Sequence, residues 1–381
     1  MSHWLSIWAQ SHTDIAFTPP DPCDRTLRFW IAAVIGGERI RITFENKVAT
    51  KGFAIGEAAL IVGSRSYPIT FGGRASVELP LAADRSCDEI PVDIQAGKLL
   101  EIRVFFPKGQ RPVSGNSMRE RVELSTKGNH VTSREFPTKN RLFQERLLSG
   151  LLMMNSAIPA VSTIEISTQD TTSAVVVFGD SIAQQCHWTK PLEQRLVREF
   201  EGKVTLVNKS IGGNRLLHDA TSIPSCGEAG IKRFRHDVVS VQGIKTVIFA
   251  LGTNDIGQPG VQQKTPVSQL PRVEEFSSAV GQLVKETHEA GLRFVATTIA
   301  PRAIQKGFLA FSQERELLRN EINAWFRSAG IFDALWDFDR ILQSPYGPGL
   351  RPDFDSGDGV HPNENGGIIL ANSIDLGTVI G

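Results

Sequence analysis

The sequence has few cysteines, no surplus of either charge and no long hydrophobic run. Its 381 residues include four cysteines, Cys23, Cys87, Cys186 and Cys226, and none of them forms a CxxC pair. This scatter argues against a disulfide framework or a zinc site and fits reduced, structural thiols. Because 41 Lys and Arg balance 41 Asp and Glu, nothing favours nucleic acid or an anionic membrane as a partner.

Segments that direct a chain to or through a membrane are also missing. No apolar run approaches the roughly 20 residues that span a bilayer. The opening MSHWLSIWAQSHTD has no basic region and too short an apolar stretch to read as a signal peptide. We therefore expect a cytoplasmic protein. No His, Asp and Glu spacing indicates a metal site, and no Gly-rich loop carries the Walker lysine, so we expect no metal and no cofactor.

Residues 1–160 are predicted to form an all-β sandwich of the jelly-roll kind. Glu38–Phe44 alternates apolar and polar residues, and the preceding run Leu27–Ile35 meets it across Gly36-Gly37, which predicts a hairpin. Regular short strands separated by turns are typical of sandwiches and jelly-rolls. Four further runs share this strand-like pattern: Ala58–Val62, Tyr67–Phe71, Ala75–Leu79 and Leu99–Phe106.

Two interpretations of this β-domain are open, carbohydrate binding and mechanical support of its neighbour. We favour support, and we expect Trp4, Trp8 and Trp30 to lie in the core.

Residues 108–172 are harder to assign than the rest of the first half. Gly109–Asn129 is polar and predicted as loop, and Arg141–Met154 fits either an amphipathic helix or a loop. Pro159–Ser173, rich in Ser and Thr, is predicted as the join between the domains.

Residues 173–381 alternate apolar runs with helical patterns, which predicts a three-layer α/β/α sandwich around a parallel sheet. The predicted strands are Ala174–Phe178, Val204–Val207, Thr246–Leu251, Phe294–Ile299 and Ala334–Phe338. Apolar helix faces are expected at Leu192, Leu196 and Phe200, at Phe276, Val280, Leu283 and Val284, and at Leu317, Leu318, Ile322 and Trp325, with a last helix from about Glu364.

Polar blocks follow three of these strands, and a fourth lies in the loop before the last helix. They are Gly179-Asp180-Ser181, Asn208–Arg215 with its Gly212-Gly213 pair, Gly252-Thr253-Asn254-Asp255, and Asp358-Gly359-Val360-His361. Each block alone is ordinary turn or helix-cap chemistry. Together they fall at the carboxyl edge of one predicted sheet, where open α/β sheets bind ligands.

In their order and residue identities, these blocks resemble those of the SGNH, or GDSL, hydrolase superfamily of esterases and lipases. The strings Gly212–Leu217, Ser356–Asn363 and Trp4–Ala9 are similar to a two-domain bacterial branch in which a β-domain precedes the hydrolase domain. With its added β-domain, that branch resembles carbohydrate esterases that remove acetyl groups from sugars.

The resemblance implies a Ser-His-Asp triad of Ser181, His361 and Asp358. The serine needs a base within hydrogen-bond reach, and Asp358 lies three residues before His361, where a tight turn brings it to Nδ1. The matching oxyanion donors are the backbone N–H groups of Ser181 and Gly213 and the side-chain amide of Asn254.

Other acids and bases are less suitable by position. The acidic rivals are Asp353 and Asp355, whose offsets from His361 do not match the family block, and Asp180, which we interpret as a brace. The possible rival bases are His187, His218, His236 and His288.

The sequence predicts a serine esterase for short-chain carboxylic esters. The expected substrate is an oligosaccharide ester or another small ester, with acetylated carbohydrates as the leading candidate. A lipase or thioesterase for longer acyl chains is the alternative within enzymes. A carbohydrate-binding protein with an inactive hydrolase domain is the alternative of another class.

Overall fold

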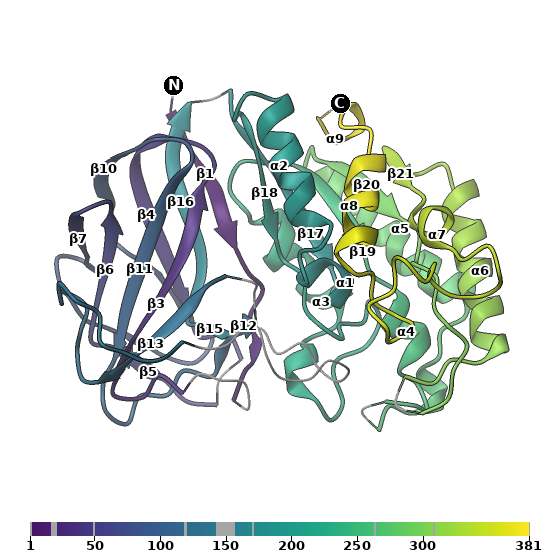
Figure 1. Cartoon of the computed structure of the whole chain (residues 1–381), viewed down its shortest axis with the longest axis horizontal. Coiled ribbons are helices and arrows are strands. Elements are labelled where there is room, and N and C mark those ends of the chain that lie inside the picture. The colour runs from purple at the N-terminus through teal and green to yellow at the C-terminus, as the bar shows by residue number, and fades with distance from the viewer. Residues whose placement is uncertain are drawn as a thin grey trace. The chain divides into compact units, whose positions relative to one another are not determined.

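The computed structural model describes residues 2–16, 21–48, 50–117, 120–141, 157–169, 171–262, 264–307 and 309–380. The chain divides into two compact units, Met1–Thr172 and Ser173–Gly381, shown in Figure 1.

Unit 1 is all β, with antiparallel pairing throughout its described strands. One sheet has the order β1 (Ser2–Ala9), β16 (Val161–Gln169), β4 (Gly37–Glu45) and β10 (Ile90–Ile94), with β9 (Asp84–Ser86) also beside β4. The other has the order β14 (Thr138–Arg141), β13 (Val122–Lys127), β3 (Arg25–Ala33), β11 (Lys98–Phe106), β6 (Glu57–Val62) and β7 (Arg65–Ile69). Smaller sheets join β15 (Ala157–Pro159), β12 (Ser114–Ser117) and β2 (Thr13–Asp14), and β5 (Phe53–Ile55) and β8 (Val77–Leu79).

Alternation along the strands builds the core of unit 1. Side chains at every second position point to the same face of a sheet, and Ile40, Ile42 and Phe44 of β4 are fully buried. Trp8 of β1 contacts Phe29 of β3, with ring centroids 5.8 Å apart, so apolar faces of the two large sheets meet.

The predicted hairpin of Leu27–Ile35 with Glu38–Phe44 is wrong. Strand β3 pairs with β11 and β13, whereas β4 pairs with β16, β10 and β9, so the Gly36-Gly37 turn carries the chain from one sheet to the other. A Cβ at Gly37 would overlap the carbonyl of Ser167 on β16, which explains why glycine suits this crossing.

The assignments in residues 108–172 also need correction. Gly109–Asn129, predicted as loop, contains β12 and β13, and the expected join Pro159–Ser173 contains β16. The polar residues Thr163, Glu165 and Ser167 alternate there with the fully buried Ile164 and Ile166, a pattern that suits a strand. Of the segment Arg141–Met154, for which helix and loop were both open, Arg141 ends β14 and residues 142–154 lie outside the described residues.

The expected burial of three tryptophans holds only for Trp8. Trp4 and Trp30 are half-buried, and the guanidinium of Arg41 lies 4.3 Å from the Trp4 ring centroid. Arg28 and Arg121 contact the Trp30 ring at 4.8 and 4.5 Å. Both rings are therefore cation–π partners on the sheet surface.

Unit 2 is built on the predicted parallel sheet. Its order is β18 (Val204–Asn208), β17 (Ser173–Gly179), β19 (Ile244–Ala250), β20 (Arg293–Thr297) and β21 (Ala334–Trp336). Because the chain runs outward from β17 to β18 and then returns to β19, the order reverses between β17 and β19. A crevice at the carboxyl ends of the strands beside such a reversal is the usual ligand site of open α/β sheets.

Helices cover both faces of this sheet, as predicted (Figure 1). Val175 and Val177 lie in one core with α2 (Thr189–Glu199), α7 (Phe338–Leu342), α8 (Glu364–Ser373) and α9 (Gly377–Ile380). On the other face Phe178 contacts Phe234 of α3 (Gly230–Phe234), and Phe249 and Phe276 contact Phe326, joining α5 (Val273–Glu289) and α6 (Gln313–Ser328).

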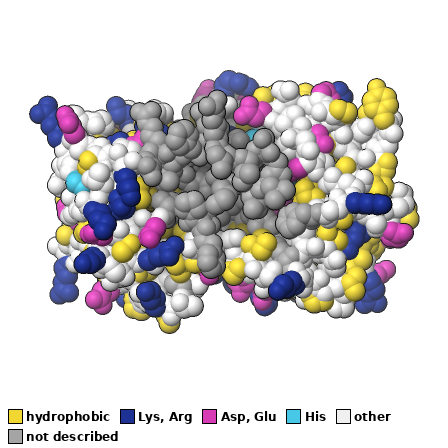
Figure 2. Space-filling view, turned by 60° about the horizontal axis from the view of Figure 1, so that its bottom comes forward, with side chains coloured by type: hydrophobic (Ala, Val, Ile, Leu, Met, Phe, Trp, Pro, Cys, Tyr) yellow, Lys and Arg dark blue, Asp and Glu magenta, His cyan; other side chains and the backbone are white. Residues whose placement is uncertain are grey.

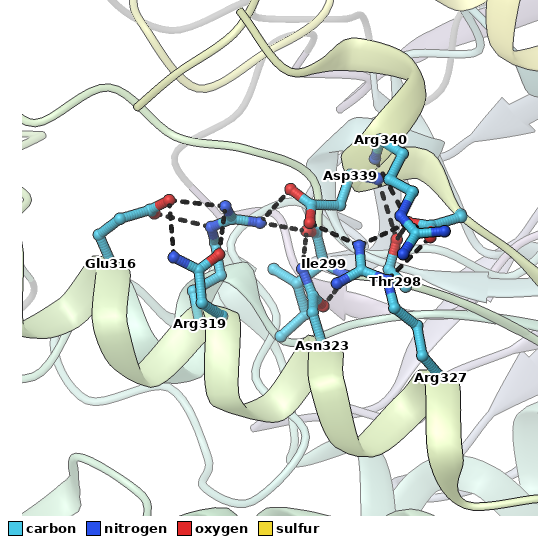
Figure 3. Close-up of polar contacts among 10 residues, drawn as sticks. Thr298, Ile299, Glu316, Arg319, Asn323, Arg327, Asp339 and Arg340 are labelled. Carbon is cyan, nitrogen blue, oxygen red and sulfur yellow. Dashed lines mark hydrogen bonds and ion pairs between the residues drawn. The ribbon is translucent and has the colours of Figure 1, made fainter. Parts of the chain in front are cut away.

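Helix α6 differs from its predicted apolar face. Leu317 is 55% exposed, while Glu316, Arg319 and Asn323 are buried with Ile322 and Phe326. Arg319 binds Glu316, Asp339 and the carbonyl of Ile299 (Figure 3). Both buried charges of this helix, those of Glu316 and Arg319, therefore have partners. The buried face of this helix is thus largely polar.

On the face shown in Figure 2, basic and acidic side chains of the described residues are interspersed. Within the described part of the chain, no helix is both long and apolar enough to cross a membrane. All four cysteines are free thiols, and burial raises the pKa of the Cys87 thiol to about 11.

Candidate active site

Gly179-Asp180-Ser181 links the end of β17 to the short helix α1 (Ser181–Gln184). Asp180 is the N-cap, and its Oδ1 accepts a 3.0 Å hydrogen bond from the Ile182 N–H. Gly179 is needed because a Cβ there would lie 2.8 Å from Ala183 Cβ and 3.0 Å from Ser210 Oγ. Turn chemistry therefore places Ser181 at the carboxyl edge of the sheet.

Ser181, His361 and Asp358 form a continuous hydrogen-bonded chain. Ser181 Oγ lies 2.8 Å from His361 Nε2, and His361 Nδ1 lies 2.6 Å from Asp358 Oδ2. The two pairs use opposite ring nitrogens of one imidazole. This is the arrangement in which a carboxylate fixes the tautomer of a base and the base receives a serine proton.

Asp358 remains ionised over the neutral range. Burial by itself would raise its pKa, but the hydrogen bond and charge of His361, with backbone N–H groups, hold the pKa well below its ordinary value. Its Oδ1 accepts from the backbone N–H groups of Val360 and His361, both at 2.9 Å. One carboxylate thus orients both the loop and the imidazole.

A second loop, after β20, supports the Asp358–His361 turn. Gln305 Nε2 donates to the Asp358 carbonyl at 2.9 Å, and the Ala303 N–H donates to the Gly359 carbonyl at 2.8 Å. Gly359 has φ +73°, and a Cβ there would lie 2.7 Å from Ala303 Cβ. Sequence reasoning missed these contacts, because they have no fixed spacing from His361.

The two remaining blocks lie against each other. Asn254 of α4 (Thr253–Gly257) donates from Nδ2 to the Asn214 carbonyl at 3.0 Å, one residue beyond Gly213. Gly213 has φ +73°, its carbonyl accepts from Gln258 Nε2 at 2.7 Å, and a Cβ there would overlap Cys226 Sγ. The close packing excludes any larger residue at position 213.

The Gly213 loop is also tied to the strand that carries Ser181. The Ile211 N–H donates to the Gly179 carbonyl at 3.1 Å. Three of the four sequence blocks, those of Ser181, Gly213 and Asn254, are therefore joined by direct hydrogen bonds between neighbouring loops.

Two buried carboxyls brace these loops. Asp255 accepts from the backbone N–H groups of Leu216 and Leu217 at 2.8 and 3.0 Å, and burial raises its pKa to about 6. Burial also raises the pKa of Asp180, to about 7, although the charges of His361 and Arg233 oppose the shift.

The rival acids and bases have other partners. Asp353 pairs with Arg351 at 2.9 Å, and Asp355 Oδ1 accepts from the Gly357 N–H at 2.8 Å. His288 pairs with Asp333 at 2.9 Å and His236 with Asp237 at 2.8 Å, while burial lowers the pKa of His218.

His187 has a structural partner near the candidate base. Its Nδ1 lies 2.8 Å from the Pro362 carbonyl, one residue beyond His361. The next residue, Trp188, is fully buried in the core.

Among the described residues, no group of three or more His, Cys, Asp or Glu side chains is placed to hold a metal ion.

Residues 177–367 match the model of the GDSL-like lipase/acylhydrolase family, half of the chain. The protein belongs to this family. The match begins in β17 and ends in α8, so it includes all four blocks at the carboxyl edge. The GDSL fold accounts for unit 2, with its parallel sheet between helices, and the all-β unit 1 precedes it.

Solved structures similar to this chain include an acetylxylan esterase from Geobacillus stearothermophilus, at 19% identity over 56% of this chain and 97% of that one, with a TM-score of 0.40. A carbohydrate acetylesterase from Sinorhizobium meliloti is 15% identical over 53% and 96%, with a TM-score of 0.40. A GDSL-like lipase from Bacteroides thetaiotaomicron is 18% identical over 54% and 87%, with a TM-score of 0.39. A search of curated proteins gave no match.

Proposed function

We propose that this GDSL acylhydrolase is a serine esterase in which Ser181, His361 and Asp358 form the catalytic triad. The hydrogen-bonded chain from Ser181 Oγ through the imidazole to Asp358, at 2.8 and 2.6 Å, is the observation that carries the proposal. A serine hydroxyl becomes an effective nucleophile only with such a base.

The reaction follows from that geometry. Ser181 Oγ attacks the ester carbonyl carbon while its proton passes to His361 Nε2, and Asp358 stabilises the imidazolium. His361 then returns the proton to the alkoxide as the C–O bond breaks, releasing the alcohol and leaving an acyl-serine. A water molecule attacks this acyl group with the same base, which frees the carboxylic acid and restores Ser181.

The oxyanion formed in each step needs preorganised donors. We assign this role to the backbone N–H groups of Ser181 and Gly213 and to the Asn254 amide, which uses one N–H on the Asn214 carbonyl and has a second to donate. Loss of one such donor typically lowers kcat by about 10²–10³.

The substrate class we propose is short-chain carboxylic esters, acetylated carbohydrates among them. The sequence blocks resemble a branch with acetylesterases, and buried polar side chains gather near the site: Gln184, Asn214, Asn254 and Gln258. A long acyl chain gains affinity by burying CH₂ groups against apolar walls, about 0.8 kcal/mol each, and polar surroundings give little of that gain.

A chain-length series of p-nitrophenyl esters from C2 to C12, with peracetylated sugars as a second panel, tests this proposal. We expect the highest kcat/KM at C2 to C4, acetate release from the sugars, and no turnover by Ser181→Ala. Best turnover at C8 or beyond would indicate a lipase or thioesterase. Equal, negligible activity of the wild type and Ser181→Ala would leave a binding protein with an inactive hydrolase domain and would overturn the enzyme assignment.

A further inference from the structure

Arg233 of α3 is fully buried beneath the carboxyl edge of the unit 2 sheet. Its Nη1 donates to the Lys209 carbonyl at 2.8 Å and to Asp237 Oδ2 at 3.0 Å. Its Nε donates to Asn214 Oδ1 at 3.0 Å, and its Nη2 to the Gly179 carbonyl at 3.3 Å. The guanidinium also lies 4.0 Å from the centroid of the Phe178 ring.

Three of these four acceptors belong to segments that carry the candidate machinery. Gly179 precedes Ser181 by two residues, and Lys209 begins the loop that leads to Gly213. Asn214 follows Gly213, and its own carbonyl accepts the hydrogen bond from Asn254. One side chain therefore connects the nucleophile turn directly to the Gly213 loop and, through Asn214, indirectly to Asn254.

The geometry of the contact set requires arginine. A guanidinium has five N–H donors in a rigid plane, so it reaches acceptors on several sides at once. A lysine ammonium is a single point of charge on a flexible stem and would reach only a subset of these acceptors.

Burying a guanidinium is costly unless its charge and donors are satisfied. Here the carboxylate of Asp237 forms an ion pair with it, and three further bonds go to neutral oxygens of the loops. The guanidinium therefore holds the backbone of two loops in place. An oxyanion site requires such fixed loops, because its donors must be positioned before the reaction.

We propose that Arg233 is a positioning residue for the oxyanion donors, holding the Ser181 turn, the Gly213 loop and Asn254 in register. The proposal rests on the proposed esterase function. Arg233 does not contact the reacting atoms and is not a catalytic residue. Its effect appears in the transition state, where donors must already be in place.

The test compares Arg233→Lys with Arg319→Lys, the same substitution at another fully buried arginine of unit 2. Arg319 binds Glu316, Asp339 and a carbonyl on the α6 flank, outside the four blocks. With p-nitrophenyl acetate we expect Arg233→Lys to lower kcat by about 10–100-fold with KM changed less than threefold. We expect Arg319→Lys to leave kcat within twofold of wild type, even if its Tm falls as much as that of Arg233→Lys.

A double variant, Arg233→Met with Asp237→Leu, removes the ion pair as a unit and avoids an unpaired buried charge. For the folded double variant we expect kcat to fall by about 100-fold. Modification of Ser181 by a small fluorophosphonate should slow by a similar factor, because the phosphoryl oxygen of the reagent also needs the oxyanion donors.

Two different failures are distinguishable. A wild-type protein without Ser181-dependent turnover refutes the esterase function itself. A wild type with Ser181-dependent turnover, beside folded Arg233 variants whose kcat and labelling rate stay within twofold, overturns the positioning role alone. An equal kcat loss in Arg319→Lys would also overturn it, because the effect would then be general destabilisation.

Discussion

Arg233 and Arg319 of unit 2 are both fully buried, and different kinds of partner stabilise their charges. On the α6 flank, Arg319 meets two carboxylates, Glu316 and Asp339 (Figure 3). At the carboxyl edge, Arg233 pairs with the carboxylate of Asp237 and donates to loop oxygens of Gly179, Lys209 and Asn214. Burial alone would lower the pKa of both groups. The carboxylates reverse that at Arg319, whose pKa is raised, whereas the pKa of Arg233 stays lowered.

We infer from this difference that the contacts of Arg319 serve stability, whereas those of Arg233 serve the candidate active site. The Arg319 charge is compensated locally, so its field has little effect on the edge of the sheet. The Arg233 charge acts on Asp180 near the nucleophile and helps to restrain the rise of its pKa. We therefore expect substitutions on the flank to change stability, and substitutions at the edge to change rate or pH dependence.

The largest effect is expected at Asp358. Asp358→Asn removes the carboxylate that fixes the His361 tautomer and stabilises the imidazolium, so kcat should fall by about 10⁴. Steady-state kinetics on p-nitrophenyl acetate measures this loss. Asp353→Asn, in an exposed pair with Arg351, is the matched control and should keep kcat within twofold. Comparable kcat for the two variants would contradict the triad.

Substitution of Arg319 on α6 should have the opposite effect, lowering stability and leaving the rate unchanged. Arg319→Met leaves Glu316 buried without its cation and Asp339 paired with Arg327 alone, and the free energy of unfolding should fall by about 3–5 kcal/mol. Urea unfolding followed by circular dichroism measures it. The folded variant should retain kcat within twofold of wild type. A tenfold or larger loss of kcat would break the distinction between the two regions.

A smaller effect is expected in the pH dependence of stability at the edge. The folded pKa of Asp180 is about 7, above its unfolded value, so the folded state binds the extra proton between roughly pH 4 and 7 and loses stability as pH rises through that window. Asp180→Asn keeps the N-cap acceptor but not the charge. Its stability relative to wild type should rise from pH 5 to pH 8 by about 3 kcal/mol at most. A difference that is constant over this range would refute the buried, proton-binding carboxyl.

The sequence predicted the sheet of unit 2 and the blocks at its edge well, because parallel strands end at a common edge and each block directly follows a strand or precedes a helix. It could not predict Arg233, since nothing in the run Lys232–Asp237 separates it from Arg235 and no spacing relates it to Gly179 or Asn214. The polar face of α6 was missed because Leu317 and Leu318 dominated the periodicity, whereas the buried charges are stabilised by partners far along the chain.

Unit 1 illustrates the same limit. Local alternation predicted strands such as β4 and β11 but not β12, β13 or β16, and a Gly-Gly turn looks alike whether it closes a hairpin or crosses between sheets. Only the close approach of Ser167 to Gly37, from a strand more than a hundred residues later, distinguishes the two.

Active-site labelling with a fluorophosphonate, read by intact-protein and peptide mass spectrometry, tests the triad most directly. We predict one adduct per chain, on Ser181, absent in Ser181→Ala and at least about 100-fold slower in His361→Ala. Labelling of a different residue, or an unchanged rate in His361→Ala, would contradict the assignment of Ser181 and His361 as nucleophile and base.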